Sequence, residues 1–183
     1  MPDLVNSFLL SQAIAAVAFG CGVVSFQLRD RRTILLWLSA SSFTNACHFF
    51  VLGKATPGIL FLIIGSRSFT AAFSVSRKVM CLFFAIILGG FYFSYSNPIG
   101  FLGLFATLTS TYASFQKTDR RVRLFMMLAN ISWTIHNLVV WTPVAAAMEA
   151  TFLVSNLLGY WRFYVRDRAA PGQDPGLTKE PTG

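Results

Sequence analysis

The segment Ser25-Phe26-Gln27-Leu28-Arg29-Asp30-Arg31-Arg32 recurs 89 residues later as Ser114-Phe115-Gln116-Lys117-Thr118-Asp119-Arg120-Arg121, with six of eight positions identical. Each copy separates two long apolar runs of the chain. Self-similarity at a fixed spacing is the sign of a repeated structural unit. We therefore predict that the chain contains two copies of one unit, built from the apolar runs around each motif.

The composition places these runs in a membrane. Of the 183 residues, 55% are hydrophobic and only 12% are charged, and the mean hydropathy is +0.59. A soluble domain carries about 25% charged residues. The shortage of charge excludes a soluble globular enzyme, a disordered chain and a nucleic-acid-binding domain. We predict a polytopic membrane protein that is embedded in the lipid bilayer.

The number of crossings follows from the length of the apolar runs, because a helix needs roughly 20 residues to cross the hydrocarbon core. Charges, prolines and glycines interrupt the sequence often enough to define seven runs of about that length. The predicted spans are 7–28, 33–53, 57–76, 78–95, 98–116, 121–141 and 143–165. The fold class is therefore all-α, with seven transmembrane helices.

The repeat divides these helices into a 3+1+3 arrangement. Residues 1–76 form the first three-helix repeat, 77–96 a linker helix, 97–165 the second repeat, and 166–183 a disordered cytoplasmic tail. Three crossings reverse the chain, so the linker crossing is needed for both copies to run in the same direction. Transporters with parallel repeats bind substrate between the repeats, near the midplane of the bilayer.

The positive charges predict the orientation, because lysine and arginine accumulate on the cytoplasmic side of bacterial membranes. Thirteen of the fifteen fall on one face if the seven spans alternate. They are Arg29, Arg31, Arg32, Arg77, Lys78, Lys117, Arg120, Arg121, Arg123, Arg162, Arg166, Arg168 and Lys179. We predict a multi-pass membrane protein with its N-terminus outside and its C-terminus in the cytoplasm.

The sequence offers no support for catalysis or for a cofactor. It has no HExxH, no GxSxG and no phosphate-binding glycine loop followed by lysine. Its cysteines, Cys21, Cys47 and Cys81, lie singly in apolar runs and form no CxxC or Cys/His metal pattern. We predict that the protein is not an enzyme and has no metal site.

Three features resemble the YgjV-type family of bacterial inner-membrane proteins: Ser25-Phe26-Gln27, the paired Arg31-Arg32, and His48-Phe49-Phe50-Val51-Leu52-Gly53. The resemblance covers roughly residues 8–165. That family is similar to the SWEET, SemiSWEET and PQ-loop transporters, which share the 3+1+3 layout. The chain has no Pro-Gln pair, so the proline hinge of the PQ-loop proteins is not carried over.

The resemblance also implies a substrate site. SWEET-like transporters place an asparagine of the third helix of each repeat, and aromatic residues of the second helix, around the sugar. Asn156 and Trp133 match these positions in the second repeat, whereas the offset of 89 places Arg67 opposite Asn156 in the first. A cation in that place favours a sugar acid or another small anionic or polar metabolite over a neutral sugar.

Arg67 and Glu149 are the two ionisable residues deepest in the predicted spans. Charges inside a membrane are costly, so each is a candidate for function with a partner to be found. They could form a structural ion pair between the repeats, or Arg67 could face a cavity and bind an anionic group. A misplaced span, with Arg67 close to the cytoplasmic surface, is a third reading.

Polar side chains recur on the second helix of each repeat. Cys47-His48 stands opposite His136-Asn137 at the offset of 89, so the two histidines are one residue out of step. Histidine titrates near neutral pH, so His48 and His136 could move protons in a coupled transporter. The alternative is hydrogen bonding between helices, in which Asn45, Asn130 and Asn137 also take part.

The repeated motif itself has two readings. Asp30 and Asp119 stand where helix N-caps are expected, and the arginines would anchor the helix starts at the headgroups. Alternatively, the motifs form a cytoplasmic gate in which Gln27 and Gln116 bond across the axis that relates the repeats. The predicted function is a small-molecule transporter of SWEET-like architecture; the alternative is a noncatalytic membrane scaffold or accessory subunit.

Overall fold

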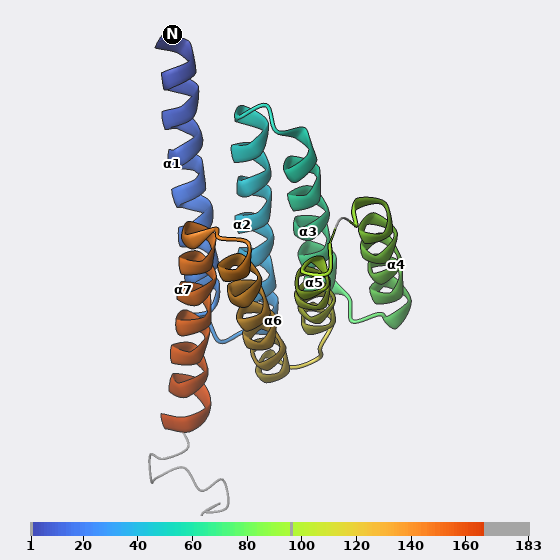
Figure 1. Ribbon diagram of the computed structural model, residues 1–183. Helices are drawn as coiled ribbons and strands as arrows, with labels where there is room; N and C mark the ends of the chain where they lie inside the picture. The colour runs from blue at the N-terminus through green and yellow to red at the C-terminus, as the bar shows by residue number, and fades with distance from the viewer. Residues whose placement is uncertain (1, 96, 167–183) are drawn as a thin grey trace, which may run out of the picture.

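The computed structural model describes residues 2–95 and 97–166, which form seven α-helices. In chain order these are α1 Pro2–Ser25, α2 Arg31–Val51, α3 Ala55–Phe73, α4 Arg77–Ser94, α5 Gly100–Ser114, α6 Asp119–Val139 and α7 Pro143–Tyr160 (Figure 1). A π-helical turn, Trp161–Arg166, continues α7. The all-α class is confirmed, and the predicted tail at 166–183 lies outside the described residues except for Arg166.

Three of the described helices are long and apolar enough to cross a membrane by length and composition: Asn6–Ser25, Arg31–Val51 and Ala55–Phe73. The second half of the chain differs from the first in two ways. Helix α5 has 15 residues, or roughly 23 Å at 1.5 Å per residue, against a hydrocarbon core of about 30 Å. Helix α6 carries four charged residues in its first five positions.

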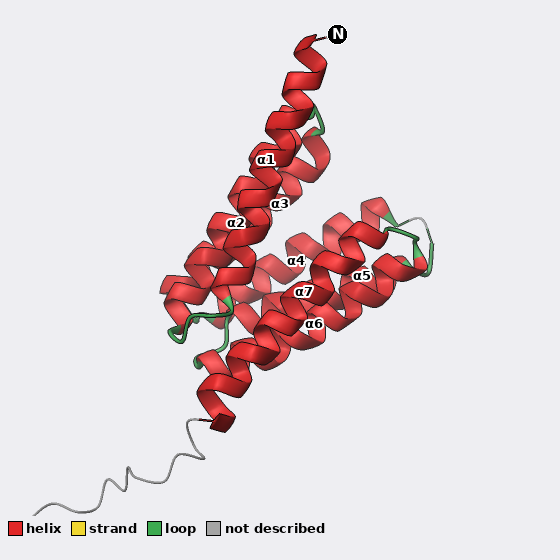
Figure 2. Ribbon diagram, turned by 90° about the vertical axis from the view of Figure 1, so that its left-hand side faces the viewer, coloured by secondary structure: helices red, strands yellow, loops and turns green. Residues whose placement is uncertain are grey.

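The helices form two groups that diverge from a common end. Helices α1, α2 and α3 pack together, α5, α6 and α7 pack together, and α4 lies against α5. Figure 2 shows the two groups splayed apart in a V. They meet at the end that contains residues 26–30 and 115–118, which we call the clamped end. At the other, open end lie the α2–α3 turn at 52–54 and the α6–α7 turn at 140–142.

Side-chain caps begin α2 and α6 at the clamped end. The carboxylate of Asp30 accepts hydrogen bonds from the backbone N–H and the hydroxyl of Thr33, both at 2.8 Å. These bonds, the backbone one first, hold the pKa of Asp30 below its ordinary value. The cap is therefore complete at neutral pH and weakens as the pH falls through that lowered pKa. The predicted Asp30 cap is confirmed.

The predicted Asp119 cap is wrong. The hydroxyl of Thr118 accepts from the backbone N–H of Arg121, so Thr118 is the N-cap and Asp119 is the first residue of α6. The carboxylate of Asp119 instead accepts a hydrogen bond from the hydroxyl of Tyr164. An acidic residue in the first turn still interacts favourably with the helix dipole.

The open ends of α2 and α6 are built alike, at an offset of 88 residues. Gly53 and Trp141 each take a positive φ, +67° and +58°, directly after the C-cap. This left-handed residue lets the chain reverse and satisfies the last helical carbonyls. Glycine adopts that conformation without strain, whereas a tryptophan rarely does so.

Equivalent positions of the two helix groups are 89 residues apart before the loops that carry the repeated motif and 88 residues apart after them. Ser25 and Ser114 end α1 and α5, 89 residues apart, but the N-caps Asp30 and Thr118 are 88 apart. The loop before α2 is therefore one residue longer than the loop before α6. The two identical Asp-Arg-Arg triplets therefore do not occupy equivalent positions in the structure, whereas His48 and His136 do.

Candidate functional site

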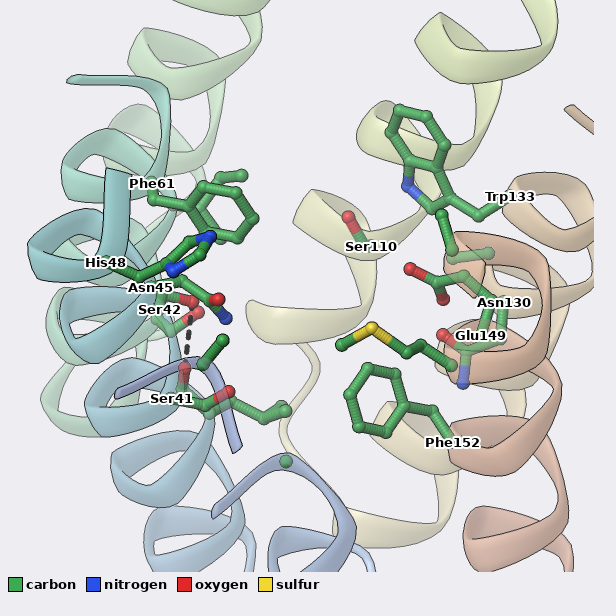
Figure 3. Close-up of a pocket in the computed structure, with 18 of the residues that line it drawn as sticks. Ser41, Ser42, Asn45, His48, Phe61, Ser110, Asn130, Trp133, Glu149 and Phe152 are labelled. Atoms are coloured by element: carbon green, nitrogen blue, oxygen red, sulfur yellow. Dashed lines mark hydrogen bonds between the residues drawn. The ribbon is translucent and has the colours of Figure 1, made fainter. Parts of the chain in front are cut away.

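A cavity of about 580 Å³ lies between the two helix groups. Figure 3 shows residues of α2 and α3 on one wall and residues of α6 and α7 on the other, with Ser110 of α5 between them. The lining begins at Phe26 and Met126 near the clamped end and reaches Leu52 and Val144 beside the open end. A cavity of this size, lined mainly by apolar and aromatic groups with a few polar ones, is typical of small-molecule sites.

Between α2 and α6 and between α3 and α7, seven pairs of lining residues are related by the offset of 88. They are Leu38 and Met126, Ser41 and Ala129, Ser42 and Asn130, Asn45 and Trp133, Phe49 and Asn137, Phe61 and Glu149, and Ile64 and Phe152. Both helix groups thus present the same helix faces to the cavity. At this offset Arg67 stands opposite Ser155, so the predicted match between Arg67 and Asn156 is wrong by one residue.

Arg67 lines the cavity and is 5% exposed. Its Nη1 donates to the hydroxyls of Thr111, at 2.7 Å, and Ser110, at 3.2 Å, both on α5. Its Nε is buried and has no hydrogen-bond partner. The guanidinium is therefore fixed against the other helix group by neutral hydroxyls, which stabilise the charge without cancelling it.

Glu149 lines the same cavity from α7 and is partly exposed to it. Within the described residues, no ion pair joins its carboxylate to Arg67, since no N···O distance falls within 4.0 Å. The arrangement matches the predicted reading in which Arg67 faces a cavity, and Glu149 lines the same cavity. The predicted structural ion pair is absent from this part of the chain.

The two histidines have equivalent bonds but different exposure to the cavity. Nδ1 of His48 lies 2.8 Å from the carbonyl oxygen of Ser11, and Nδ1 of His136 lies 3.3 Å from that of Ile99. A carbonyl oxygen can only accept, so Nδ1 is the donor in both. His48 lines the cavity, and so does Asn137, whereas His136 packs edge-on against Trp133 and is not part of the lining.

Several polar lining residues were not among the predicted substrate-binding residues, although Asn45 and Asn130 had been predicted to belong to polar clusters on the second helix of each repeat. Hydroxyl and amide side chains surround the deep part of the cavity, on α2, α3, α5 and α6. They are Ser41, Ser42, Asn45, Ser68, Thr107, Ser110 and Asn130. Serine and threonine are common in membrane helices, so their helix faces became clear only once the helices were packed. Trp133, the aromatic residue predicted for the site, lines the cavity as expected.

At the clamped end, Arg31 of α2 binds the loop that follows α5. Its Nη2 donates to the carbonyls of Ser114, at 2.9 Å, and Ala71, at 2.7 Å, and its Nε donates to the carbonyl of Gln116. One guanidinium thus joins α3 of its own group to the first loop of the opposite group.

Arg123 of α6 makes the reciprocal connection and is fully buried. Its Nη1 donates to the carbonyl of Phe26 at 2.8 Å, and its Nη2 donates to the carbonyl of Leu28. Asn156 holds this arginine in place: its Oδ1 lies 3.4 Å from Nη1, and its Nδ2 donates to the Arg123 carbonyl at 2.9 Å. Asn156 is fully buried here and does not line the cavity, contrary to the prediction.

The glutamines of the motif bond elsewhere than predicted. Gln27 donates to the hydroxyl and the carbonyl of Ser155, at 2.8 and 3.0 Å, and so joins α1 to α7. Gln116 donates to the carbonyl of Tyr112, within its own group. The predicted Gln27–Gln116 bond is absent from the described structure, and the arginines join the two loops instead.

Gly159 of α7 packs closely against Arg123 and Phe26 at the clamped end. A Cβ there would collide with the carbonyl oxygen of Phe26 and with the guanidinium of Arg123. We expect Gly159→Ala to lower the free energy of unfolding by roughly 1–3 kcal/mol, the usual cost of overpacking. The melting temperature of the purified protein, measured by size-exclusion chromatography after heating, checks this.

Gly20→Ala is the matched control, because nothing lies within 4 Å of a Cβ at Gly20. It also sits within a helix, where alanine is favoured over glycine by about 1 kcal/mol. We expect its melting temperature to be unchanged or slightly raised. Equal stability of the two variants would show that the Phe26–Arg123–Gly159 contact is not tight.

Residues 2–95 and 97–166 contain no cluster of three histidine, cysteine, aspartate or glutamate side chains placed to hold a metal ion. The chemistry available in the cavity is therefore that of one guanidinium, one carboxylate, one imidazole, and neutral amide, hydroxyl and aromatic groups. Such a set can bind a small solute by charge and hydrogen bonds.

Comparison with known proteins places the chain among membrane proteins. A family model described as a bacterial inner membrane protein, Imp-YgjV, matches residues 9–167. The inner membrane protein YgjV of Escherichia coli (strain K12) is 28% identical over 159 residues, which is 87% of each chain. No solved structure matches.

Proposed function

Because the chain belongs to the YgjV family of bacterial inner membrane proteins, we propose that it carries a small polar solute across the inner membrane. The observation that carries this proposal is the cavity between the two helix groups. Polar side chains line its deep part, the two helix groups diverge toward one end, and arginine-to-carbonyl bonds join the groups at the other end. A carrier that alternates between two open states needs a site of this kind.

We propose that α1–α3 and α5–α7 are parallel repeats joined by α4. Support comes from the equal ends of α2 and α6 and from the seven lining pairs at one offset. Helix α4 packs against α5, beside the cavity rather than around it. Transport then follows from a rocking of one helix group against the other, with the cavity as the fixed site.

We propose further that the clamped end faces the cytoplasm. Arg29, Arg32, Arg120 and Arg121 lie at or directly before the starts of α2 and α6 at that end, and Lys54 lies at the open end. Under the positive-inside rule this distribution puts the N-terminus outside and the C-terminus inside. The conformation described is then open to the periplasm, and the two arginines form the closed cytoplasmic gate.

The lining favours a small polar or charged solute over a neutral sugar. A sugar offers hydrogen bonds to Asn45, Asn130 and Asn137, but it leaves the charges of Arg67 and Glu149 without partners. Leaving a buried charge unpaired is costly. Sugar acids and other small charged metabolites are therefore the substrates to test first.

Uptake into proteoliposomes tests the proposal. The purified full-length protein is reconstituted, and radiolabelled sugars, sugar acids, organic acids and amino acids are added singly. We expect saturable, protein-dependent uptake of at least one charged solute. A lack of uptake and of binding across the panel, with correctly inserted protein, would favour the noncatalytic scaffold.

A matched pair of bulky substitutions locates the route. Ala145 lines the cavity near the open end, whereas Ala147, two residues on, is exposed and is not part of the lining. We expect Ala145→Trp to reduce uptake at least tenfold by filling the entrance and Ala147→Trp to leave it unchanged. Equal uptake by the two variants would place the route outside this cavity.

A further inference from the structure

The cavity is lined by one basic and one acidic side chain, Arg67 and Glu149, which do not pair with each other. The guanidinium of Arg67 bonds only to neutral hydroxyls, and its buried Nε has no partner. Within residues 2–95 and 97–166, the carboxylate of Glu149 has neither a hydrogen-bond partner nor an ion pair. A bound molecule that supplies the missing partners gains interactions that the empty site lacks.

No other group in the lining supplies a counter-charge. Helix α1 contributes the amide Gln12 to the lining, α5 contributes hydroxyls, and α6 contributes amides and Trp133. The single further titratable group is His48 on α2, which already donates to the Ser11 carbonyl. Among the described lining residues, the charge balance therefore rests on Arg67 and Glu149.

This balance discriminates among classes of solute. A neutral solute leaves both charges unpaired, a monoanion pairs Arg67 but is repelled by Glu149, and a monocation does the reverse. Like charges in a site of low dielectric constant repel strongly. A molecule with one carboxylate and one ammonium group satisfies both residues at once.

We infer that the solute is a small zwitterion, with its carboxylate against Arg67 and its ammonium group against Glu149. This inference rests on the proposed transport function and names its substrate class: a free amino acid or an ω-amino acid. The guanidinium can bind a carboxylate through parallel N–H groups. Phe61 and Trp133, which line the same cavity, offer ring faces that attract an ammonium group.

The depths of Arg67 and Glu149 in the cavity determine the orientation of the bound zwitterion. Glu149 is six residues from the start of α7, and Arg67 is twelve from the start of α3. At 1.5 Å per residue these are roughly 9 and 18 Å from the open ends of their helices. The ammonium group therefore lies nearer the open end, and the carboxylate lies deeper.

Binding by matched probes tests the inference. The probes are ω-amino acids of two to six carbons, each compared with the alkanoate and the alkylamine of equal chain length. Affinities are measured by isothermal titration calorimetry on the full-length protein in nanodiscs. We expect one chain length of the zwitterion to bind at least tenfold more tightly than either singly charged analogue.

Two charge-neutralising variants give opposite shifts. Glu149→Gln should remove the preference for zwitterion over alkanoate, and Arg67→Gln should remove the preference for zwitterion over alkylamine. Size-exclusion profiles matching the wild type show that each variant is folded. A wild type that binds alkanoate as tightly as zwitterion, or a Glu149→Gln variant with unchanged preference, would overturn the inference.

The outcomes separate this inference from the proposed function. Uptake of a sugar acid or a neutral sugar, blocked by Ala145→Trp, would retain the carrier and reject the zwitterion. Absence of uptake and of binding for all probes would reject both. Zwitterion binding that follows the two charge variants supports the substrate class directly.

Discussion

Replacing Arg123 with methionine is expected to open the clamped end to the cytoplasm. The guanidinium donates to the carbonyls of Phe26 and Leu28 and is held by Asn156. A hydrogen bond from a charged donor contributes about 1.5–3 kcal/mol, and 1.4 kcal/mol changes a population tenfold. Losing even one such bond should raise the population open at this end at least tenfold.

Cysteine labelling measures this population. Thr107 lines the cavity and is partly exposed, so a cysteine there reports access to the cavity. The background lacks Cys21, Cys47 and Cys81, and a membrane-impermeant maleimide is added to inside-out vesicles. We expect slow labelling in the presence of Arg123 and labelling at least tenfold faster in Arg123→Met.

Arg121→Met is the control for this experiment. Arg121 is exposed at the same end, and its backbone N–H, not its side chain, bonds to Thr118. The substitution removes a positive charge from the surface without touching the loop of the other helix group. Equal labelling of Arg121→Met and Arg123→Met would show that net charge, rather than the Arg123 bonds, keeps this end closed.

Arg67→Met should reduce uptake to the level of protein-free liposomes. Arg67 is the one arginine or lysine among the described lining residues, so its loss removes the partner for a solute carboxylate. Methionine fills similar space, and its substitution for a buried charge spares the desolvation cost of that charge. We therefore expect the variant to insert and purify normally, as size-exclusion chromatography can verify.

Three further variants show which property of Arg67 is needed for uptake. Arg67→Lys keeps a positive charge without the planar fork, so we expect partial uptake. Thr111→Val removes one acceptor of the guanidinium but keeps the charge, and should retain most uptake. Lys54→Met, at the exposed open end, should have no effect. Unchanged uptake in Arg67→Met would remove Arg67 from the substrate site.

The sequence predicted the helices well because their boundaries are set by local signals. Asp30 has the side chain for an N-cap, and Pro143 begins α7, where its missing N–H is not needed. The exact register of the repeat was harder to predict. Identical Asp-Arg-Arg triplets favoured an offset of 89, whereas the loop before α2 contains an extra residue that shifts the helices to 88.

The candidate site was predicted in part. Arg67, Glu149, His48, Trp133 and Asn137 line one cavity, as their depth in the spans suggested. Their mutual arrangement depends on how each helix is rotated about its own axis, and a hydropathy pattern does not determine that rotation. The hydroxyls that hold Arg67 belong to α5, whose serines and threonines carry no distinctive spacing.

The closing arginines were missed for a different reason. Arg31 and Arg123 belong to clusters that the positive-inside rule already explains, so nothing marked them as gate residues. Arg123 follows Val122 within the predicted sixth span, and both are fully buried. A basic residue inside a predicted span rather than in the loop before it, with a carboxamide such as Asn156 on the next helix, is the signal that could have identified it.

The arginines of the clamped end bind main-chain oxygens of residues 26, 28, 114 and 116 rather than carboxylates. Such oxygens do not titrate in water, and every amino acid has one. Acidification should consequently leave this barrier intact, and drift in loop sequence should be tolerated. Any acid sensitivity in solute flux must then originate in groups other than these arginine-to-carbonyl bonds.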